Sequence, residues 1–404
     1  MVVTSNDLQR RLDPARAPQW TESSPLQVEQ LKELFDGRSG STIGLEEELM
    51  LLDPETMEVS PEAELVLGLV AGDDRFAAGR RQGQIEIRTQ VCGNAVAAAL
   101  CLADAILSLR DRLAGKLAIA SAGTHPFSSS WGAVTRGQRY RKLAAEFPQA
   151  AHGNLPSGLH VHVAVSGAER ALAVYNAARS FLPELTALAA NSPFLDGEDT
   201  GLASARSQLT LAFHRSGVPP AFPSWEAYVE LVEWGRRGGV FPDASHLWWD
   251  LRPHSQFGTI ELRCPDSQTR VEDAAAVAAL FQCLLVWLAN RYDEQEELAV
   301  HDTSRIAENV WRASRYGTHG YMVDPVTGEQ EETRSRIRRL LGALEPTASS
   351  YGTSWALLTA SVLLADNGAD RQRYVAERHG LDGLTRWLAD ETVSSAQDYL
   401  ERRT

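Results

Sequence analysis

The stretch Ile43-Gly44-Leu45-Glu46-Glu47-Glu48-Leu49 alternates apolar with charged residues. Successive side chains of a β-strand point to opposite faces, so this alternation predicts a half-buried strand with Leu45 and Leu49 against a core. The same pattern recurs in three further stretches, at 84–88, 159–163 and 259–263. Together the four stretches predict strands that bury one face and carry charged side chains on the other.

The charged face combines carboxylates, imidazoles and guanidinium groups, contributed by Glu46, Glu48, Glu86, Glu261, His160, His162, Arg88 and Arg263. Carboxylates do not gather in a fold unless positive charge holds them there. Oxygen-rich sites suit Mg²⁺ or Mn²⁺, and the planar fork of arginine suits phosphate. The pattern therefore predicts a site for divalent cations and phosphate.

Each stretch also has a simpler interpretation. Glu46 and Glu48 fit a solvated acidic edge, and Glu261 with Arg263 fits an ordinary salt bridge. A histidine at position 160 or 162 fits a hydrogen-bonded structural residue. Four strands with one kind of chemistry on one face favour the metal and phosphate site over these separate interpretations.

The composition is that of an ordinary globular protein, with 404 residues, 44% hydrophobic and 23% charged. A formal net charge of −14 argues against nucleic acid or an anionic membrane surface as a partner. We see no run of the roughly 20 apolar residues that span a membrane, and no apolar signal region at the N-terminus. Four scattered cysteines without a C-x-x-C pair argue against a disulfide framework or a zinc finger. We therefore expect a cytoplasmic protein.

The order of the predicted elements indicates an α+β fold with an antiparallel or mixed sheet, because strands come before residue 270 and helices after it. We expect a partly disordered arm over 1–40 and one catalytic domain over 41–404, with a sheet-forming part (41–270) and a helical part (271–404). Long helices are predicted near 95–116 and 167–190. Neither a G-x-G-x-x-G fingerprint nor a P-loop is present, so a Rossmann site is not supported.

Five motifs resemble the glutamate–cysteine ligase type 2 family, carboxylate–amine ligases with a glutamine-synthetase-like fold. They are Gly44-Leu45-Glu46-Glu47-Glu48, Gln84-Ile85-Glu86-Ile87-Arg88-Thr89, Gly158-Leu159-His160-Val161-His162, Trp249-Asp250-Leu251-Arg252-Pro253-His254 and Gly258-Thr259-Ile260-Glu261-Leu262-Arg263. The resemblance covers roughly residues 40 to 365. It implies a curved, mainly antiparallel sheet with helices on its convex face and a funnel-shaped site on its concave face.

The resemblance also implies roles for individual residues. Metal binding falls to Glu46, Glu48, Glu86 and Glu261, with Glu261 and Arg263 as catalytic residues and Arg263 at the γ-phosphoryl group. Nucleotide contacts fall to His160, Arg252, Arg312 and Arg315, and substrate contacts to Arg88, His162 and Arg215. The role of His162 is left open, because bacterial relatives do not all keep a histidine there. Loops near 125–141, 191–222 and 316–328 are expected to shape the substrate pocket.

The reaction implied is ATP-dependent amide formation, with cofactors ATP and Mg²⁺ or Mn²⁺. ATP would phosphorylate a carboxylate, glutamate being the expected donor, and cysteine or another amine would attack the acyl phosphate. A general base is needed for the amine, and the sequence does not name it. A metal-dependent hydrolase, a phosphotransferase and a non-catalytic binder stay as alternatives. The helical part leaves a homo-oligomer open.

Overall fold

The computed structural model describes residues 25–128, 132, 135, 146 and 156–403. Their central feature is a seven-stranded antiparallel sheet in the order β10-β11-β5-β1-β3-β2, with β4 beside the second half of β1. The strands are β1 (Ile43–Leu52), β2 (Phe76–Ala78), β3 (Gln84–Arg88), β4 (Ala118–Ala120), β5 (Leu159–Ala164), β10 (Leu251–His254) and β11 (Thr259–Leu262). All four strands predicted from the alternating stretches are present, and each pairs with another of the four.

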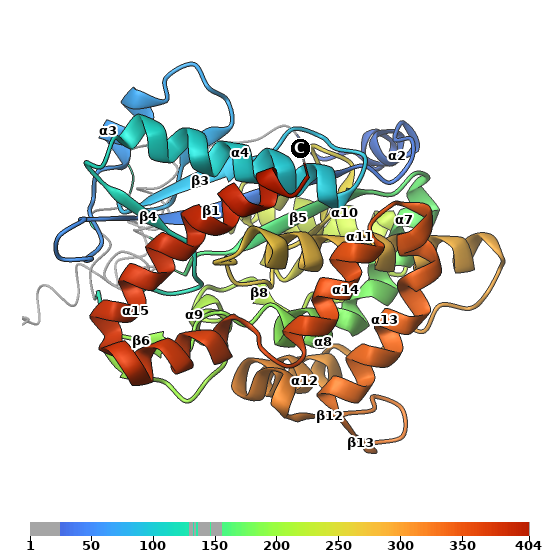
Figure 1. Ribbon diagram of the computed structural model, residues 1–404. Helices are drawn as coiled ribbons and strands as arrows, with labels where there is room; N and C mark the ends of the chain where they lie inside the picture. Colours follow the sequence, from blue (N-terminus) through green and yellow to red (C-terminus); the bar gives the residue numbers. More distant parts are fainter. Residues whose placement is uncertain (1–24, 129–131, 133–134, 136–145, 147–155, 404) are drawn as a thin grey trace, which may run out of the picture.

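One face of the sheet is fully buried, as the alternation predicts. The side chains on it include Leu45, Leu49, Ile85, Val161 and Leu262. Three helices pack on this face, namely α4 (Ala95–Leu113), α7 (Ala168–Ala178) and α11 (Val271–Asp293). Figure 1 shows α4 running beside β1 and β3, with α11 next to β5. The opposite face is therefore the one that carries the charged residues.

The central helix α11 is long and apolar enough to cross a membrane by length and composition alone, which the sequence analysis did not anticipate. Of its most apolar window, 89% is buried inside the protein. Its neighbours are α4, α7, α13 and α14, so nearly every side of the helix faces protein. A helix that is apolar all round is expected at the centre of a large core.

The helix predicted over 167–190 is divided. Helix α7 ends at Ala178, a 3₁₀ turn covers Arg179–Phe181, and α8 covers Leu182–Leu188. Pro183 explains the division, because it lacks the N–H that would bond the carbonyl of Arg179 and its ring crowds that carbonyl. By contrast, α4 begins as predicted, with Asn94 Oδ1 accepting a hydrogen bond from the Ala97 N–H.

The helical part wraps around the sheet domain. Helices α12 (Thr303–Tyr316), α13 (Thr333–Ser350), α14 (Ser354–Leu363) and α15 (Gly368–Glu401) make up most of it, with a small hairpin of β12 (Tyr321–Val323) and β13 (Gln330–Glu332). In Figure 1, α15, drawn in red, crosses β4 and reaches α4, with which it packs. The N-terminal segment adds α2 (Val28–Asp36), whose Leu31 and Phe35 are buried in the core. The arm prediction for residues 1–24 lies outside the described residues.

The remaining elements are short, apart from α10, and mostly connect the sheet to its surroundings. They are α3 (Ala63–Leu69), β6 (Phe194–Leu195), β7 (Glu198–Asp199), α9 (Ala205–Thr210), β8 (Ser216–Gly217), α10 (Trp225–Arg237), β9 (Trp248–Trp249) and the 3₁₀ turns at Ala244–His246 and Gly317–His319. The segment 191–222, predicted to be irregular, thus contains β6, β7, α9 and β8.

Candidate active site

Strand register brings the predicted charged residues together. Glu46 on β1 lies opposite His160 on β5 and opposite Arg88 on β3. In the same sheet Glu48 faces Glu86 across β1 and β3. One strand further along, Glu261 on β11 lies opposite both His162 on β5 and Arg252 on β10. We call the group formed by Glu46, Glu86, Glu261, His160 and His162 the carboxylate cluster.

The centre of the carboxylate cluster is His162. Its Nε2 atom lies 3.7 Å from Glu46 Oε1 and 3.8 Å from Glu261 Oε1. Among the described residues this buried nitrogen has no hydrogen-bond partner, whereas Nδ1 lies 3.1 Å from Thr259 Oγ1. One ligand atom from each of Glu46, His162 and Glu261 lies within 4.8 Å of the other two. These three residues have the spacing and chemistry to hold a cation.

Glu46 is also held by His160, whose Nδ1 lies 3.2 Å from Glu46 Oε2. Burial alone would raise the pKa of Glu46, but its interactions with His160 and His162 outweigh burial and lower the pKa below its ordinary value. Burial lowers the pKa of His160, and the positive charge of Arg263 lowers it further. The cluster is therefore arranged around an ionised glutamate and a neutral imidazole at position 160.

Glu261 is fully buried between two arginines. Both Arg252 and Arg263 donate hydrogen bonds to its carboxylate, and Arg252 also donates to the carbonyls of Ser245 and Leu247. Burial works against the charge on Glu261, yet the two guanidinium groups keep its pKa well below the ordinary value. Arg252, expected to contact nucleotide, is thus bonded to Glu261 and to the main chain. Arg263 pairs with Glu261 and also lines the adjoining cavity.

Glu86 pairs with Arg88, a neighbour of the cluster whose side chain is half exposed. Arg88 Nε lies 2.6 Å from Glu86 Oε1 and 4.0 Å from Glu46 Oε1. Burial, together with the charge of Glu46, raises the pKa of Glu86 to about 7. The Arg88 guanidinium acts in the opposite direction and does not outweigh burial and the neighbouring carboxylate.

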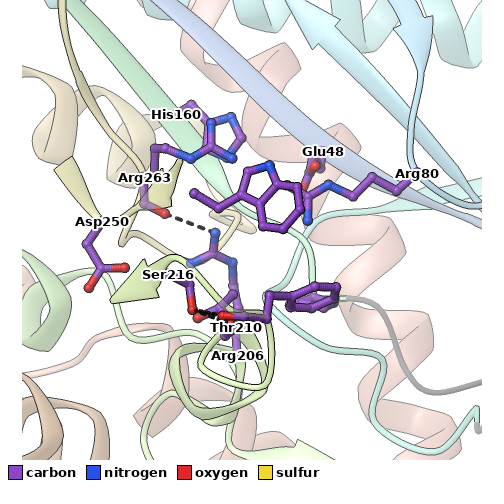
Figure 2. Close-up of a pocket in the computed structure, with 11 residues that line it drawn as sticks. Glu48, Arg80, His160, Arg206, Thr210, Ser216, Asp250 and Arg263 are labelled. Carbon is purple, nitrogen blue, oxygen red and sulfur yellow. Dashed lines mark hydrogen bonds between the residues drawn. The ribbon is translucent and has the colours of Figure 1, made fainter. Parts of the chain in front are cut away.

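A cavity adjoins the cluster, and Figure 2 shows its lining. Its charged and titratable residues are Glu48, Arg80, His160, Arg206, Asp250 and Arg263. Phe213 and Trp248 add aromatic surface. Arg263 connects the cavity to the carboxylate cluster, because it lines the cavity and pairs with Glu261. Glu48 turns toward the cavity wall, where its Oε2 accepts a 2.8 Å hydrogen bond from the Gly158 N–H.

Three predicted binding arginines lie apart from the cluster. Arg312 pairs with Glu308 of its own helix at 3.1 Å, and Arg315 lies 5.3 Å from the Tyr316 ring. Arg215 pairs with Glu146 and lies 5.4 Å from the Trp248 ring, just behind the cavity wall. In the described part of the chain none of the three contacts a cluster carboxylate, so their binding roles stay predictions.

Sequence reasoning gave no role to four polar residues of this region. Arg206 donates to the main-chain carbonyls of Arg263 and Cys264, which fixes the segment after β11. Asp250 and Arg80 line the cavity. Glu47 points to the core face, where burial raises its pKa to about 8. The period-two pattern does predict a buried Glu47, since it shares a face with Leu45. Asp250 lies within one of the five motifs, which gave it no role, and no pattern marks Arg80 or Arg206.

The model for glutamate–cysteine ligase family 2 matches residues 42–394. The chain belongs to the glutamate–cysteine ligase family 2. The family resemblance drawn from the five motifs is thereby confirmed, and the match extends beyond the predicted limit near residue 365 to include most of α15. The family is one of ligases, so the chain is related to enzymes that form C–N bonds.

Relatives in this family are similar over nearly their whole length. A Rubrobacter xylanophilus protein named "Putative glutamate–cysteine ligase 2-3" is 39% identical over 366 residues, covering 87% of this chain and 97% of the relative. A Gloeobacter violaceus protein named "Putative glutamate–cysteine ligase 2" is 35% identical, covering 84% of this chain and 94% of the relative. The match therefore includes the sheet and the helical part together.

Two solved structures share the fold. The glutamate–cysteine ligase of Francisella tularensis, in complex with AMP, superposes with a TM-score of 0.65 at 13% identity, covering 90% of this chain and 89% of that one. A bifunctional glutathione synthetase from Pasteurella multocida gives a TM-score of 0.62 at 15% identity, covering 93% of this chain and 54% of that one. The predicted fold class is confirmed by these likenesses and by the antiparallel sheet itself.

Proposed function

We propose that this chain is a cytoplasmic, ATP-dependent carboxylate–amine ligase that forms a γ-glutamyl amide through an acyl phosphate. The observation that carries the proposal is the Nε2 of His162, which has no hydrogen-bond partner in the described part of the chain and lies near one carboxylate oxygen from each of Glu46 and Glu261, beside Arg263. Support comes from membership of a glutamate–cysteine ligase family and from the AMP in the Francisella tularensis structure.

The residues of the cluster fit a divalent cation. Among the described residues, the buried Nε2 of His162 has no hydrogen-bond partner, and one carboxylate oxygen from each of Glu46 and Glu261 lies within 4 Å of it. A cation bound between them would take all three atoms as ligands. Two oxygens and one imidazole suit Mn²⁺ as well as Mg²⁺. Bound there, the cation would neutralise the oxygens of the ATP phosphates. Glu46, His162 and Glu261 would hold it, with Glu86 and Glu48 completing the acidic face.

Arg263 is placed to handle the phosphoryl group. Its guanidinium is buried and fixed by Glu261, and it borders the cavity where a carboxylate substrate would enter. A fixed guanidinium stabilises the charge on a phosphoryl group in transfer better than a mobile one, because it needs no reorganisation. Arg252 acts as a positioning residue, since its hydrogen bonds reach Glu261 and the main chain. Arg206 holds the backbone of Arg263 from the other side.

A product assay tests the proposed reaction. Purified protein is incubated with Mg·ATP, glutamate and a panel of amines that includes cysteine, while ADP, phosphate and amide products are followed. Phosphate release that requires both glutamate and an amine is the expected result. ADP formation that requires no amine would indicate a phosphotransferase, and formation of neither ADP nor phosphate would indicate a metal-dependent hydrolase or a non-catalytic binder.

The structure also guides the choice of variants for that assay. Glu261→Gln would leave two buried arginines without their shared partner, and breaking a buried pair of this kind costs about 3–5 kcal/mol of stability. Loss of turnover in that variant would not distinguish unfolding from the loss of a catalytic group. His162→Gln and Glu86→Gln remove cluster ligands without leaving such a pair, so they are the better probes.

A further inference from the structure

Asp250 occupies a fixed place on the cavity wall. It lies between β9 and β10, where its N–H donates a 2.9 Å hydrogen bond to the carbonyl of Gly217. Its own carbonyl accepts a 2.8 Å hydrogen bond from the N–H of Arg263. The main chain of Asp250 is thus held on both sides, and its side chain lines the cavity next to Arg263 (Figure 2).

The carboxylate of Asp250 is left without a committed partner. No hydrogen bond to it comes from any residue in the described ranges; it feels Arg206 and Arg263 only through their charge. Both cations are engaged elsewhere, Arg206 with the carbonyls of Arg263 and Cys264, and Arg263 with Glu261. A carboxylate at the edge of a cavity, near two arginines that bind other groups, is available for a ligand.

The electrostatics suit a proton acceptor. Burial raises the pKa of Asp250 to about 6, although Arg206 and Arg263 act in the opposite direction. The side chain is therefore ionised near neutral pH, yet more basic than an ordinary aspartate. Other titratable groups around it are Cys264 next to Arg263, and the cavity residues Glu48, Arg80 and His160.

The position of Asp250 relative to Arg263 indicates which substrate it contacts. If Arg263 and the carboxylate cluster receive the phosphoryl group, the acyl carbon of the acyl phosphate lies at the border between cluster and cavity. The leaving phosphate then faces Glu261, and the attacking amine must approach through space that the cluster does not occupy. Asp250 borders that space, because it lines the cavity together with Arg263, whose guanidinium pairs with Glu261 and whose N–H bonds to the Asp250 carbonyl.

We propose that Asp250 is the general base of the amide-forming step, binding the ammonium form of the incoming amine and removing a proton from it. This inference rests on the proposed function. The ammonium group gives one proton to the Asp250 carboxylate, and the freed nitrogen lone pair attacks the acyl carbon. The new C–N bond forms, the C–O bond to phosphate breaks, and the leaving phosphate takes the second proton from nitrogen.

The variant Asp250→Asn tests the assignment, because it keeps the shape of the side chain and removes its basicity. With an amino-acid amine, kcat is expected to fall by about 10²–10⁴-fold, the usual contribution of a general base. Hydroxylamine, which is uncharged at neutral pH, needs no such base. With hydroxylamine as the amine, glutamate-dependent phosphate release by Asp250→Asn should stay within a few-fold of wild type. With the amino-acid amine, kcat/KM of the wild type should rise with pH near 6, and this rise should be absent in Asp250→Asn.

Two outcomes would overturn the assignment. Equal loss with hydroxylamine and with the amino-acid amine would show that Asp250 serves phosphoryl transfer or folding, and unchanged rates with both would show that it takes no part. Asp243→Asn, which removes an acid of the neighbouring 3₁₀ turn that does not line the cavity, is the matched control. A wild-type protein that releases no phosphate with any amine would overturn the proposed function itself, a result distinct from the other two.

Discussion

The surroundings of His162 are the main structural evidence for the proposed cation site. His162 sits on a strand that the alternation of residues 159–163 predicts, and its face was predicted with it. Its Nε2 atom, unpartnered within the described residues, supports the proposal that His162 is a cation ligand rather than a structural histidine. Family resemblance left the role of this residue open, so the proposal depends on the geometry around Nε2.

Replacing His162 should weaken cation binding without unfolding the protein. We expect His162→Gln to lower the affinity for Mn²⁺ by at least about 10–100-fold, the loss seen even when residues that only orient ligands are removed. Titration of free Mn²⁺ by electron paramagnetic resonance measures this affinity. His379→Gln, at an exposed histidine of α15, is the matched control. An affinity equal to wild type in His162→Gln would remove His162 from the site.

His125 makes stability depend on pH. Its Nδ1 accepts hydrogen bonds from the N–H groups of Phe127 and Ser128, and its Nε2 lies 2.9 Å from the Met57 carbonyl. Burial lowers the pKa of His125 to about 4, so the unfolded chain binds the proton more tightly than the folded one. The stability that this residue contributes is therefore present above pH 6.5 and is lost as pH falls toward 4.

We expect this one residue to reduce the free energy of unfolding by about 2 kcal/mol between pH 7 and pH 5. Urea unfolding at the two pH values measures the change. His125→Asn, whose side-chain oxygen can still accept the two N–H groups, should show a pH dependence smaller by that amount. The same pH dependence in variant and wild type would mean that His125 does not titrate as described.

At the scale of single elements, the sequence predicts what local chemistry controls. The alternation in 43–49 gives β1, and Asn94 gives the start of α4. The break between α7 and α8 was missed, although Pro183 is visible in the sequence, because the surrounding apolar periodicity continues through it. The Glu261–Arg263 pair follows from the alternation along one strand, whereas the Arg252–Glu261 pair was beyond prediction, since it depends on the register between β10 and β11.

Gly380 sets a bend in α15 that a side chain would strain. Its φ of 66° and ψ of −178° lie in a region that is essentially restricted to glycine. Gly380→Ala should therefore destabilise the protein by about 1–3 kcal/mol. Gly342→Ala in α13, where the added methyl group meets nothing within 4 Å, should instead stabilise it by roughly 0.5–1 kcal/mol. Chemical denaturation of both variants measures the change in the free energy of unfolding, which should be negative for Gly380→Ala and positive for Gly342→Ala. Changes of the same sign would contradict this prediction.

At the scale of the whole molecule, the last helix completes the sheet domain. Leu384 and Leu388 pack with Met50 and Leu52 of β1. The Ser121 N–H donates to Thr392 Oγ1 at 3.0 Å, which ties the segment after β4 to α15. The Ser121–Thr392 hydrogen bond joins residues 271 positions apart, and the leucine contacts join residues still further apart, so no local pattern in the sequence predicts them. They join the sheet-forming part to the helical part, and the single catalytic domain stays a prediction.

A chain shortened to residue 380 should fail to fold, because it exposes the apolar side chains of β1 and β4 that α15 covers. Near-ultraviolet circular dichroism and urea unfolding are the measurements. We expect loss of the near-ultraviolet signal and of a cooperative transition, whereas removal of only 402–404 should change neither. A shortened protein that unfolds cooperatively would show that the sheet forms a separate domain.

In the proposed reaction a substrate carboxylate is activated by phosphoryl transfer at the cluster beside Arg263. Glutamate labelled with ¹⁸O in its γ-carboxylate tests this claim most directly, with the phosphate released by the amine-dependent reaction analysed by mass spectrometry. Transfer of one ¹⁸O atom from the carboxylate to each phosphate is the predicted result. Phosphate that carries no label, while amide forms from labelled glutamate, would contradict an acyl phosphate.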